Sequence, residues 1–253
     1  MDDETLAASL VREAGALAAT MLADGLETEY KTSVSDVVSA ADHAAEELVV
    51  RRLDDERPAD GLVGEEGSAR PGERTWYIDP VDGTYNFLSG IPYWCSAVGL
   101  VDAEGPVLGA VFYPALDQLW IGGRDRPTTL NDQPVPVIAD VALAEISVAT
   151  YFHPRRLRDS DQVAAWRAAV SAAATVRMLG SASIDLAGVA SGRLGVFLQA
   201  NLHPWDWYPG AALVIGAGGV AEVVRHEGND WQIAGNARAV AETAAAQRSA
   251  ARR

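Results

Sequence analysis

The spacing of apolar side chains predicts two helices at the start of the chain. Over residues 6–22 and again over residues 40–54, apolar side chains recur at the spacing that places them on one face of a helix. We expect the first of these helices to cover a sheet. The stretch between the two helices, residues 28–39, is polar and has few apolar anchors.

From residue 61 the pattern changes to short apolar runs separated by turn residues. Such runs are typical of strands, and the breaks at residues 104–106 and at Pro114 divide them into hairpins. A succession of hairpins predicts an antiparallel sheet. The runs cover residues 62–64, 75–78 and a series from 95 to 122.

After residue 136 predicted strands and helices alternate, which is typical of an α/β arrangement. We therefore expect an α+β half, residues 1–135, and an α/β half, residues 136–253, which together form one domain with helices sandwiching its sheets. The predicted strands are residues 146–150, 176–179, 195–198 and 220–224, and the predicted helices are residues 161–174, 184–191, 207–217 and 239–253.

The composition is that of a globular protein and argues against polyanionic partners. Of the 253 residues, 49% are hydrophobic, which is enough to bury a sizeable core. The formal net charge of −15 opposes attraction to nucleic acid or to an anionic membrane surface. No apolar run reaches the roughly 18 residues of a membrane span, and the first residues are acidic where a signal peptide is basic. We expect a cytoplasmic protein without nucleic-acid or membrane partners.

Two residue types occur only once. Cys95 cannot form an internal disulfide and has apolar neighbours, so we expect a buried structural thiol. Lys31 is the only lysine among 20 basic residues and lies in the polar stretch after the first helix. Its position is compatible with a functional role and equally with an ordinary surface site.

The segment from Asp79 to Thr84 contains the densest chemical signal. Asp79 and Asp82 stand three residues apart at the end of an apolar strand, so that both carboxylates can converge with the carbonyl oxygen of Val81. Such an oxygen set suits a hard cation. Gly83 allows a ligand to approach the backbone, and Thr84 begins a short predicted helix whose N–H groups would face a phosphate. The alternative is an ordinary Asp-Pro turn before a helix.

Two further acidic residues occupy comparable places. Glu65 follows the predicted strand at residues 62–64, although an acidic loop residue is usually just solvated. Asp206 precedes an apolar helix and could simply cap it. Trp205 and Trp207 would hold the Asp206 carboxylate in a partly dry setting, where an unpaired charge is costly and a metal ion would remove the cost. Carboxylates gathered in one pocket repel one another unless cations neutralise them.

These motifs resemble those of the inositol monophosphatase family. The resemblance implies a layered αβαβα sandwich, of α+β and α/β character, of the inositol monophosphatase / fructose-1,6-bisphosphatase type. It also implies a Mg²⁺-dependent phosphatase for small phosphate monoesters, working as a homodimer. The motifs are Lys31 with Asp36 and Asp42, Gly64-Glu65-Glu66, Asp79-Pro80-Val81-Asp82-Gly83-Thr84, Gly180-Ser181-Ala182 and Trp205-Asp206.

The resemblance also implies roles for single residues. Glu65 and Thr84 would position the attacking water, and Asp82 would join them in catalysis. Asp42 would lie in a second shell, with Lys31 and Asp36 in a mobile loop. Two or three Mg²⁺ would be bound by Glu65, Asp79, the Val81 carbonyl, Asp82 and Asp206, and phosphate or substrate by Gly83, Thr84, Gly180, Ala182, Gln199 and Asp206.

One position departs from the inositol-specific pattern. Gln199 stands seven residues before Asp206, where those members have a glutamate that accepts hydrogen bonds from substrate hydroxyls. An amide can still bond hydroxyls, but it is uncharged and also donates. Inositol 1-phosphate is the leading substrate on this evidence, with histidinol phosphate, a sugar phosphate or a 3'-phosphonucleotide as alternatives. A non-catalytic regulatory binding protein is the alternative from another class.

Overall fold

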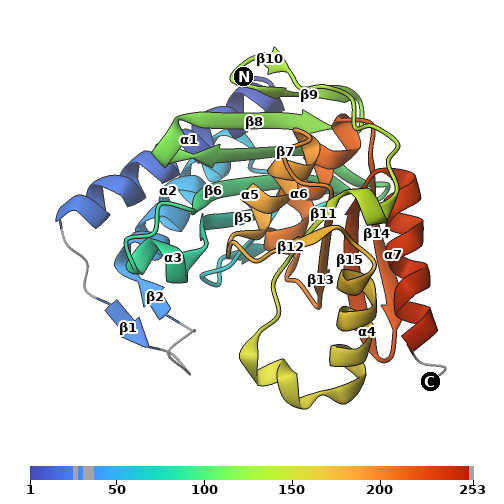
Figure 1. Ribbon diagram of the computed structural model, residues 1–253. Helices are drawn as coiled ribbons and strands as arrows, with labels where there is room; N and C mark the ends of the chain where they lie inside the picture. The colour runs from blue at the N-terminus through green and yellow to red at the C-terminus, as the bar shows by residue number, and fades with distance from the viewer. Residues whose placement is uncertain (25–27, 31–36, 251–253) are drawn as a thin grey trace.

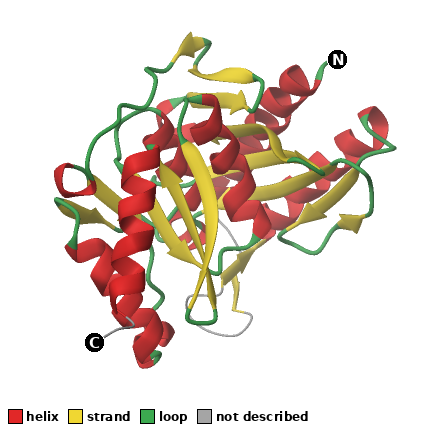
Figure 2. Ribbon diagram, turned by 90° about the vertical axis from the view of Figure 1, so that its right-hand side faces the viewer, coloured by secondary structure: helices red, strands yellow, loops and turns green. Residues whose placement is uncertain are grey.

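Two large sheets and three layers of helices build the protein. The computed structural model describes residues 1–24, 28–30 and 37–250. In Figure 1, α1 and α2 lie on the side opposite to α4 and α7, with α5 and α6 between the two sheets. The five layers confirm the predicted αβαβα sandwich. The two termini lie at opposite sides of the molecule (Figure 2).

The first sheet has eight strands in the order β10-β9-β8-β7-β6-β5-β3-β4. All neighbours are antiparallel except β3 and β5, so the predicted antiparallel sheet contains one parallel pair. Its strands are β3 (Gly61–Gly64), β4 (Ala69–Arg70), β5 (Thr75–Asp82), β6 (Cys95–Asp102), β7 (Gly105–Tyr113), β8 (Gln118–Gly123), β9 (Arg126–Leu130) and β10 (Gln133–Pro134).

Helices α1 (Asp3–Asp24) and α2 (Ala40–Glu56) cover the outer face of this sheet. By length and composition alone α1 could cross a membrane. Its side chains Leu6, Leu10 and Val11 are instead fully buried in one cluster with side chains of α2 and the sheet, as in a core helix. Apolar burial therefore fixes α1 in the place where the sequence predicts it.

The second sheet has five strands in the order β12-β11-β13-β15-β14. Its first three strands are parallel and the last two join in antiparallel fashion. Helices α4 (Ser160–Ser171) and α7 (Ala237–Ala250) pack on its outer face. The strands are β11 (Ser147–Thr150), β12 (Thr175–Arg177), β13 (Val196–Ala200), β14 (Val220–His226) and β15 (Asn229–Gly235).

The middle layer consists of α5 (Ala182–Ala190) and α6 (Pro204–Gly216), whose side chains share a core with both sheets. Short elements complete the fold. These are the pair β1 (Thr28–Tyr30) and β2 (Val37–Ser39), helix α3 (Thr84–Leu88), and the single turns η1 (Pro114–Leu116), η2 (Leu143–Glu145) and η3 (Pro154–Arg158).

Several strands differ from the sequence-based expectations. Strand β5 does not end at Ile78 but continues to Asp82, because β6 pairs with it as far as Asp79 and again at Asp82. Strand β15 has no predicted counterpart, although it lies between β13 and β14. Strands β1 and β2 fall in the stretch that was expected to lack apolar anchors. Pairing with another strand, rather than local hydrophobic spacing, creates these strands: β1 and β2 pair with each other, and β15 pairs with β13 as well as with β14.

Two glycines determine how closely α6 approaches the first sheet. Gly99 and Gly109 are opposite each other on β6 and β7 and face the backbone of α6 at Pro209. A methyl group at Gly99 would lie 2.8 Å from the Pro209 nitrogen, and one at Gly109 would overlap the Pro209 carbonyl oxygen. Glycine at these positions therefore permits the close packing that positions the start of α6.

We predict that Gly109→Ala lowers the free energy of unfolding by about 1–3 kcal/mol, as expected for overpacking. Gly99→Ala should cost less, because its added methyl group meets the helix at a longer distance. Denaturant unfolding of both variants and of the wild type measures these differences. Equal stability of all three would mean that α6 does not rest on these glycines.

Candidate active site

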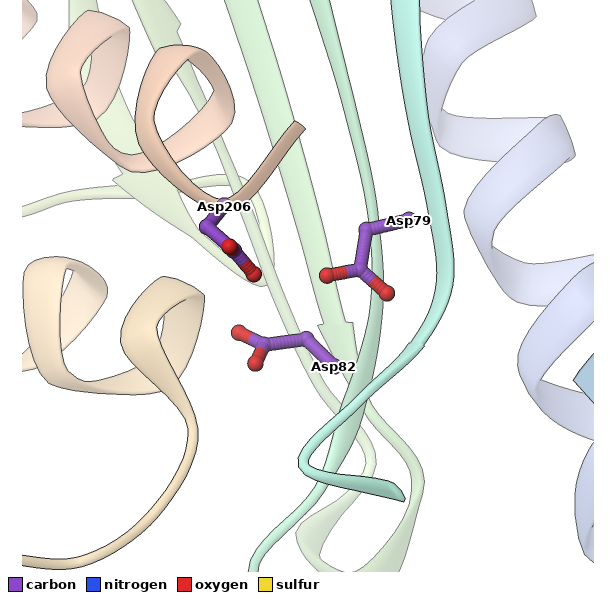
Figure 3. Close-up of side chains that lie close together, drawn as sticks. All are labelled: Asp79, Asp82 and Asp206. Carbon is purple, nitrogen blue, oxygen red and sulfur yellow. The ribbon is translucent and has the colours of Figure 1, made fainter. Parts of the chain in front are cut away.

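Three aspartates from distant parts of the chain converge at the end of strand β5, which lies in the first sheet between β6 and β3. Asp79 and Asp82 lie on β5 and Asp206 in the first turn of α6, and each offers a carboxylate oxygen within 4.8 Å of the others. Figure 3 shows the three side chains pointing toward one another. In a regular strand, residues three apart face opposite sides. The register shift between Asp79 and Asp82 bends β5, and both side chains can then face the same point.

The three carboxylates are poorly solvated, and their negative charges lie close together. Burial, followed by the charges of Glu65 and Asp82, raises the pKa of Asp79 well above its ordinary value. Burial and the charge of Asp82 raise the pKa of Asp206 to about 7. At this separation two ionised carboxylates repel by roughly 3 kcal/mol at an effective dielectric constant near 20. Without a cation, the cluster cannot hold all its negative charges at neutral pH.

Asp82 has hydrogen-bond partners that belong to the other half of the chain. Its carboxylate accepts from the Ser181 hydroxyl at 2.9 Å, from the Ala182 N–H at 3.2 Å and from the Ser183 N–H. These donors form the N-terminus of α5, where a negative charge is favourable. Burial still raises the pKa of Asp82, because desolvation outweighs these hydrogen bonds. Asp82 therefore joins the two halves as well as belonging to the carboxylate cluster.

Asp79 contrasts with Asp82, because its buried Oδ1 atom has no hydrogen-bond partner in the described part of the chain. A buried carboxylate oxygen without a partner is costly. A hard divalent cation, coordinated by carboxylate oxygens, would remove that cost. The donor set of Asp79, Asp82 and Asp206 could thus hold a metal ion, and the orphaned oxygen shows where one fits.

Glu65 stands at the rim of this cluster, directly after β3. The residue retains an exposed surface, yet its carboxylate is surrounded by protein. Desolvation, followed by the charges of Asp206 and Asp42, raises its pKa well above the ordinary value. Because part of the residue is exposed, water screens some of this repulsion, but the direction of the pKa shift is upward. Asp42, which was expected to lie in a second shell around the metal ligands, is buried on α2.

A buried glutamate that was absent from the sequence prediction holds the loop of Glu65 in place. The Glu46 carboxylate accepts from the Glu66 N–H at 2.8 Å and from the Ser68 N–H at 3.0 Å. It occupies the space that a side chain at position 64 would need, which explains Gly64. Helix α2 therefore determines where Glu65 lies.

A cavity of about 840 Å³ opens beside the cluster. Gly83 and Gly180 approach each other there with positive φ angles of 96° and 93°, and a methyl group on Gly83 would lie 3.1 Å from the Gly180 carbonyl oxygen. Side chains at these positions would be strained. The predicted site residues that line the cavity are Asp82, Gly83, Thr84, Gly180, Ala182, Gln199 and Asp206.

The remaining predicted residues lie elsewhere. Asp79, Glu65 and Val81 are not among the residues that line the cavity. The Val81 carbonyl accepts a hydrogen bond from the Thr84 hydroxyl at 3.1 Å, which leaves one lone pair for another partner. No hydrogen bond joins Glu65 to Thr84 among the residues that the structure describes. Lys31 and Asp36 lie outside the described residues.

Sequence reasoning missed an acid–phenol pair at the cavity, whose wall includes the buried Asp185. The Tyr93 hydroxyl donates to Asp185 Oδ1 at 2.7 Å. Burial raises the pKa of Asp185 to about 8, despite the opposing effect of that hydrogen bond. Asp185 follows the Ser181 N-cap of α5, and this capping pattern was the available signal. Cys95 is buried near Asp82 and Ser181, and burial raises the pKa of its thiol, in agreement with a structural role.

Comparison with known proteins adds independent information. The family model described as "Inositol monophosphatase family" matches residues 2–253. An inositol-1-monophosphatase from Rhizobium meliloti is 38% identical over 190 residues, which cover 73% of this chain and 71% of the relative. A protein named Nus factor SuhB from Xylella fastidiosa is 36% identical over 198 residues, or 77% of this chain and 72% of the relative.

Solved structures agree with the sequence relatives. The extragenic suppressor protein suhB from Bartonella henselae superposes with a TM-score of 0.85 at 28% identity, covering 96% of this chain and 97% of that one. An inositol monophosphatase from Thermotoga maritima also gives 0.85, at 25% identity and with 100% and 99% coverage. Together with the match over almost the whole sequence, these likenesses show that the chain belongs to the inositol monophosphatase family, whose members are phosphatases of small phosphate monoesters.

Proposed function

We propose that this protein hydrolyses a small phosphate monoester in a Mg²⁺-dependent reaction, with inositol 1-phosphate as the leading substrate. The observation that carries the proposal is the convergence of Asp79, Asp82 and Asp206 around a buried, unpartnered carboxylate oxygen. Membership of a phosphatase family supports the same activity.

In this proposal each half of the chain has its own task. Residues 1–135 supply most ligands, and residues 136–253 supply Asp206 and the substrate contacts. When bound, Mg²⁺ supplies the positive charge that offsets the carboxylates and polarises the phosphate for attack. Two or three ions would be held by Glu65, Asp79, the Val81 carbonyl, Asp82 and Asp206.

The backbone at Gly83 and Thr84 would hold the phosphate, because glycine at position 83 leaves the N–H groups open to the cavity. The Thr84 hydroxyl gives its only proton to the Val81 carbonyl, so it can only accept a hydrogen bond from water. Thr84 and Glu65 would then orient that water toward phosphorus.

The proposed reaction is an in-line displacement. The water oxygen forms a bond to phosphorus while the ester P–O bond breaks. Glu65 would take a proton from the water and release it to solvent, and the leaving alkoxide would take a proton from solvent, so that the alcohol and inorganic phosphate are the products. With a cation neutralising the cluster, Glu65 would be ionised and able to act as this base.

The identity of the leaving alcohol is the least constrained part of the proposal. Gln199 lies on the cavity wall and offers an uncharged amide to a substrate hydroxyl. Histidinol phosphate, a sugar phosphate and a 3'-phosphonucleotide are therefore kept as alternatives. On the resemblance alone we also propose a homodimer in the cytoplasm.

A second candidate function is regulatory binding without catalysis. One relative is named a Nus factor, which is a name of that protein and not evidence of activity in this one. The carboxylate cluster favours the enzyme, because a protein that only binds partners has no need for three converging acids, two of them buried and one half-buried.

We predict no hydrolysis of inositol 1-phosphate in excess EDTA and full recovery when Mg²⁺ is restored. Phosphate release from a panel of monoesters, measured with and without Mg²⁺, tests this. Undiminished turnover in EDTA would contradict the metal dependence. Failure on every ester in Mg²⁺ would favour the regulatory alternative.

We predict that Asp79→Asn and Asp82→Asn each lower kcat by at least about a hundredfold, as loss of a transition-state contact of on the order of 3 kcal/mol requires. Their stabilities in EDTA should differ. Asp79→Asn should melt no lower than wild type, because it removes repulsion and because its Oδ1 atom accepts no hydrogen bond in the described part of the chain. Asp82→Asn should have a lower melting temperature than wild type, because the Asn amide nitrogen is itself a donor and would face the hydrogen-bond donors at the start of α5.

Thermal unfolding of both variants in EDTA and in Mg²⁺ checks this contrast. Mg²⁺ should raise the melting temperature of each variant less than that of the wild type. If Asp79→Asn retains near-normal rates, the assignment of this cluster as the active site is wrong.

A further inference from the structure

The cavity beside the carboxylate cluster has an apolar wall that the proposed chemistry does not use. Tyr85, Tyr151, Met178 and Leu179 line it and are exposed by 56%, 39%, 47% and 37%. They make up four of the ten large hydrophobic residues that are exposed in the described part of the chain. Exposed apolar side chains concentrated around one cavity mark a surface that an apolar ligand group covers.

The two tyrosines come from different halves of the chain and approach the same part of the cavity. Tyr85 lies on α3, directly after Thr84, and Tyr151 follows β11. The phenol groups are near enough that Tyr85, after burial, contributes to a raised pKa of Tyr151. The Tyr151 ring also packs edge-on against His153, with ring centroids 6.2 Å apart. A flat group attached to a phosphate at Gly83 and Thr84 would therefore meet aromatic surface.

Most polar groups of the wall are already engaged with the protein. The Asn86 amide donates to the carbonyl oxygens of Tyr93 and Leu179 at 2.9 and 2.8 Å. The Ser181 hydroxyl donates to Asp82, and the Asp185 carboxylate accepts from Tyr93. A polyol has a hydroxyl on nearly every carbon, and each one that loses water without gaining a partner costs free energy.

The hydroxyls of Tyr85 and Tyr151 make no hydrogen bond to another described residue, and the side chains of Gln199 and Arg155 make no hydrogen bond or ion pair there. Gln199 and Arg155 both present donors, and Arg155 also presents positive charge. Their donors can bind acceptor atoms on the ring of a bound alcohol. A volume of about 840 Å³ accommodates an alcohol of nucleoside size.

We propose that the preferred substrates are phosphate monoesters whose alcohol carries an aromatic ring, bound between Tyr85 and Tyr151. This inference rests on the proposed phosphatase function and names a preferred substrate class in place of inositol 1-phosphate, which the resemblance alone favours. A nucleoside and a simple arylalkyl alcohol both carry an aromatic ring, and the test distinguishes these two kinds of alcohol.

The first experiment compares kcat/KM in Mg²⁺ for 2-phenylethyl phosphate and 2-cyclohexylethyl phosphate. Their leaving alcohols are similar in acidity and size, so the ratio reports on the aromatic ring. We expect a ratio of at least about fivefold, in keeping with stacking on aromatic side chains. Adenosine 3'-phosphate is measured in parallel. If its kcat/KM exceeds that of 2-phenylethyl phosphate, a nucleoside is the preferred alcohol.

Variants test whether the tyrosines cause the preference. Tyr85→Leu and Tyr151→Leu should lower the ratio toward one, mainly through KM, while Tyr85→Phe and Tyr151→Phe should retain it because the ring remains. Leu157→Ala is the matched control, since Leu157 is an exposed apolar residue on η3, which follows Tyr151 in the sequence, but does not line the cavity. It should leave the ratio unchanged.

The outcomes distinguish the two proposals. Hydrolysis of inositol 1-phosphate with a ratio near one, or a ratio that both leucine variants leave intact, overturns the aromatic preference alone. Absence of hydrolysis for every ester, including inositol 1-phosphate, overturns the phosphatase function itself.

Discussion

Mutual repulsion among buried carboxylates is the constraint that the structure around the site accommodates. Asp79, Asp82 and Asp206 are held within 4.8 Å of one another by elements that are stabilised elsewhere. The irregular end of β5 places the side chains of Asp79 and Asp82 on one side. Helix α6 packs against Gly99 and Gly109, and this packing places Asp206, in its first turn, beside them. Hydrophobic burial in the layers overcomes the cost of the cluster in the absence of a cation. The site is therefore preorganised, and a cation would find its ligands already in place.

The same arrangement joins the two halves of the chain at the point of the proposed chemistry. Asp82 belongs to the first sheet but accepts hydrogen bonds from the N-terminus of α5, and Gly83 touches Gly180 across the same boundary. A phosphate held at Gly83 would thus lie between the halves, beside the carboxylates. The alcohol would extend along a wall built from α3 and from the segment after β11, where Tyr85 and Tyr151 lie. In this proposal substrate choice would depend on the cavity wall, and metal binding on the carboxylate cluster beside it.

Much of this could be predicted from the sequence because it is local. Apolar spacing identifies the helices, and the segment from Asp79 to Thr84 brings its own carboxylates, turn and helix start together. What could not be predicted depends on contacts between distant residues. Strand β15 exists through its pairing with β13 and β14, and the bend of β5 through pairing with β6. Glu46 and Asp185 look like solvated helix residues until the fold buries them. The roles of the site residues remain proposals that rest on this geometry.

The pH dependence of stability, with and without Mg²⁺, tests the repulsion most directly. Since burial and neighbouring charges raise the pKa values of Asp79, Glu65 and Asp206, the last to about 7, the metal-free folded protein binds more protons than the unfolded chain above about pH 4. Its free energy of unfolding should therefore fall from pH 5 to pH 8 in EDTA. Saturating Mg²⁺ should remove most of that fall, because the ligands are then ionised and neutralised; the remainder belongs to Asp185. Denaturant unfolding across this range measures both profiles, and identical slopes with and without Mg²⁺ would contradict the account.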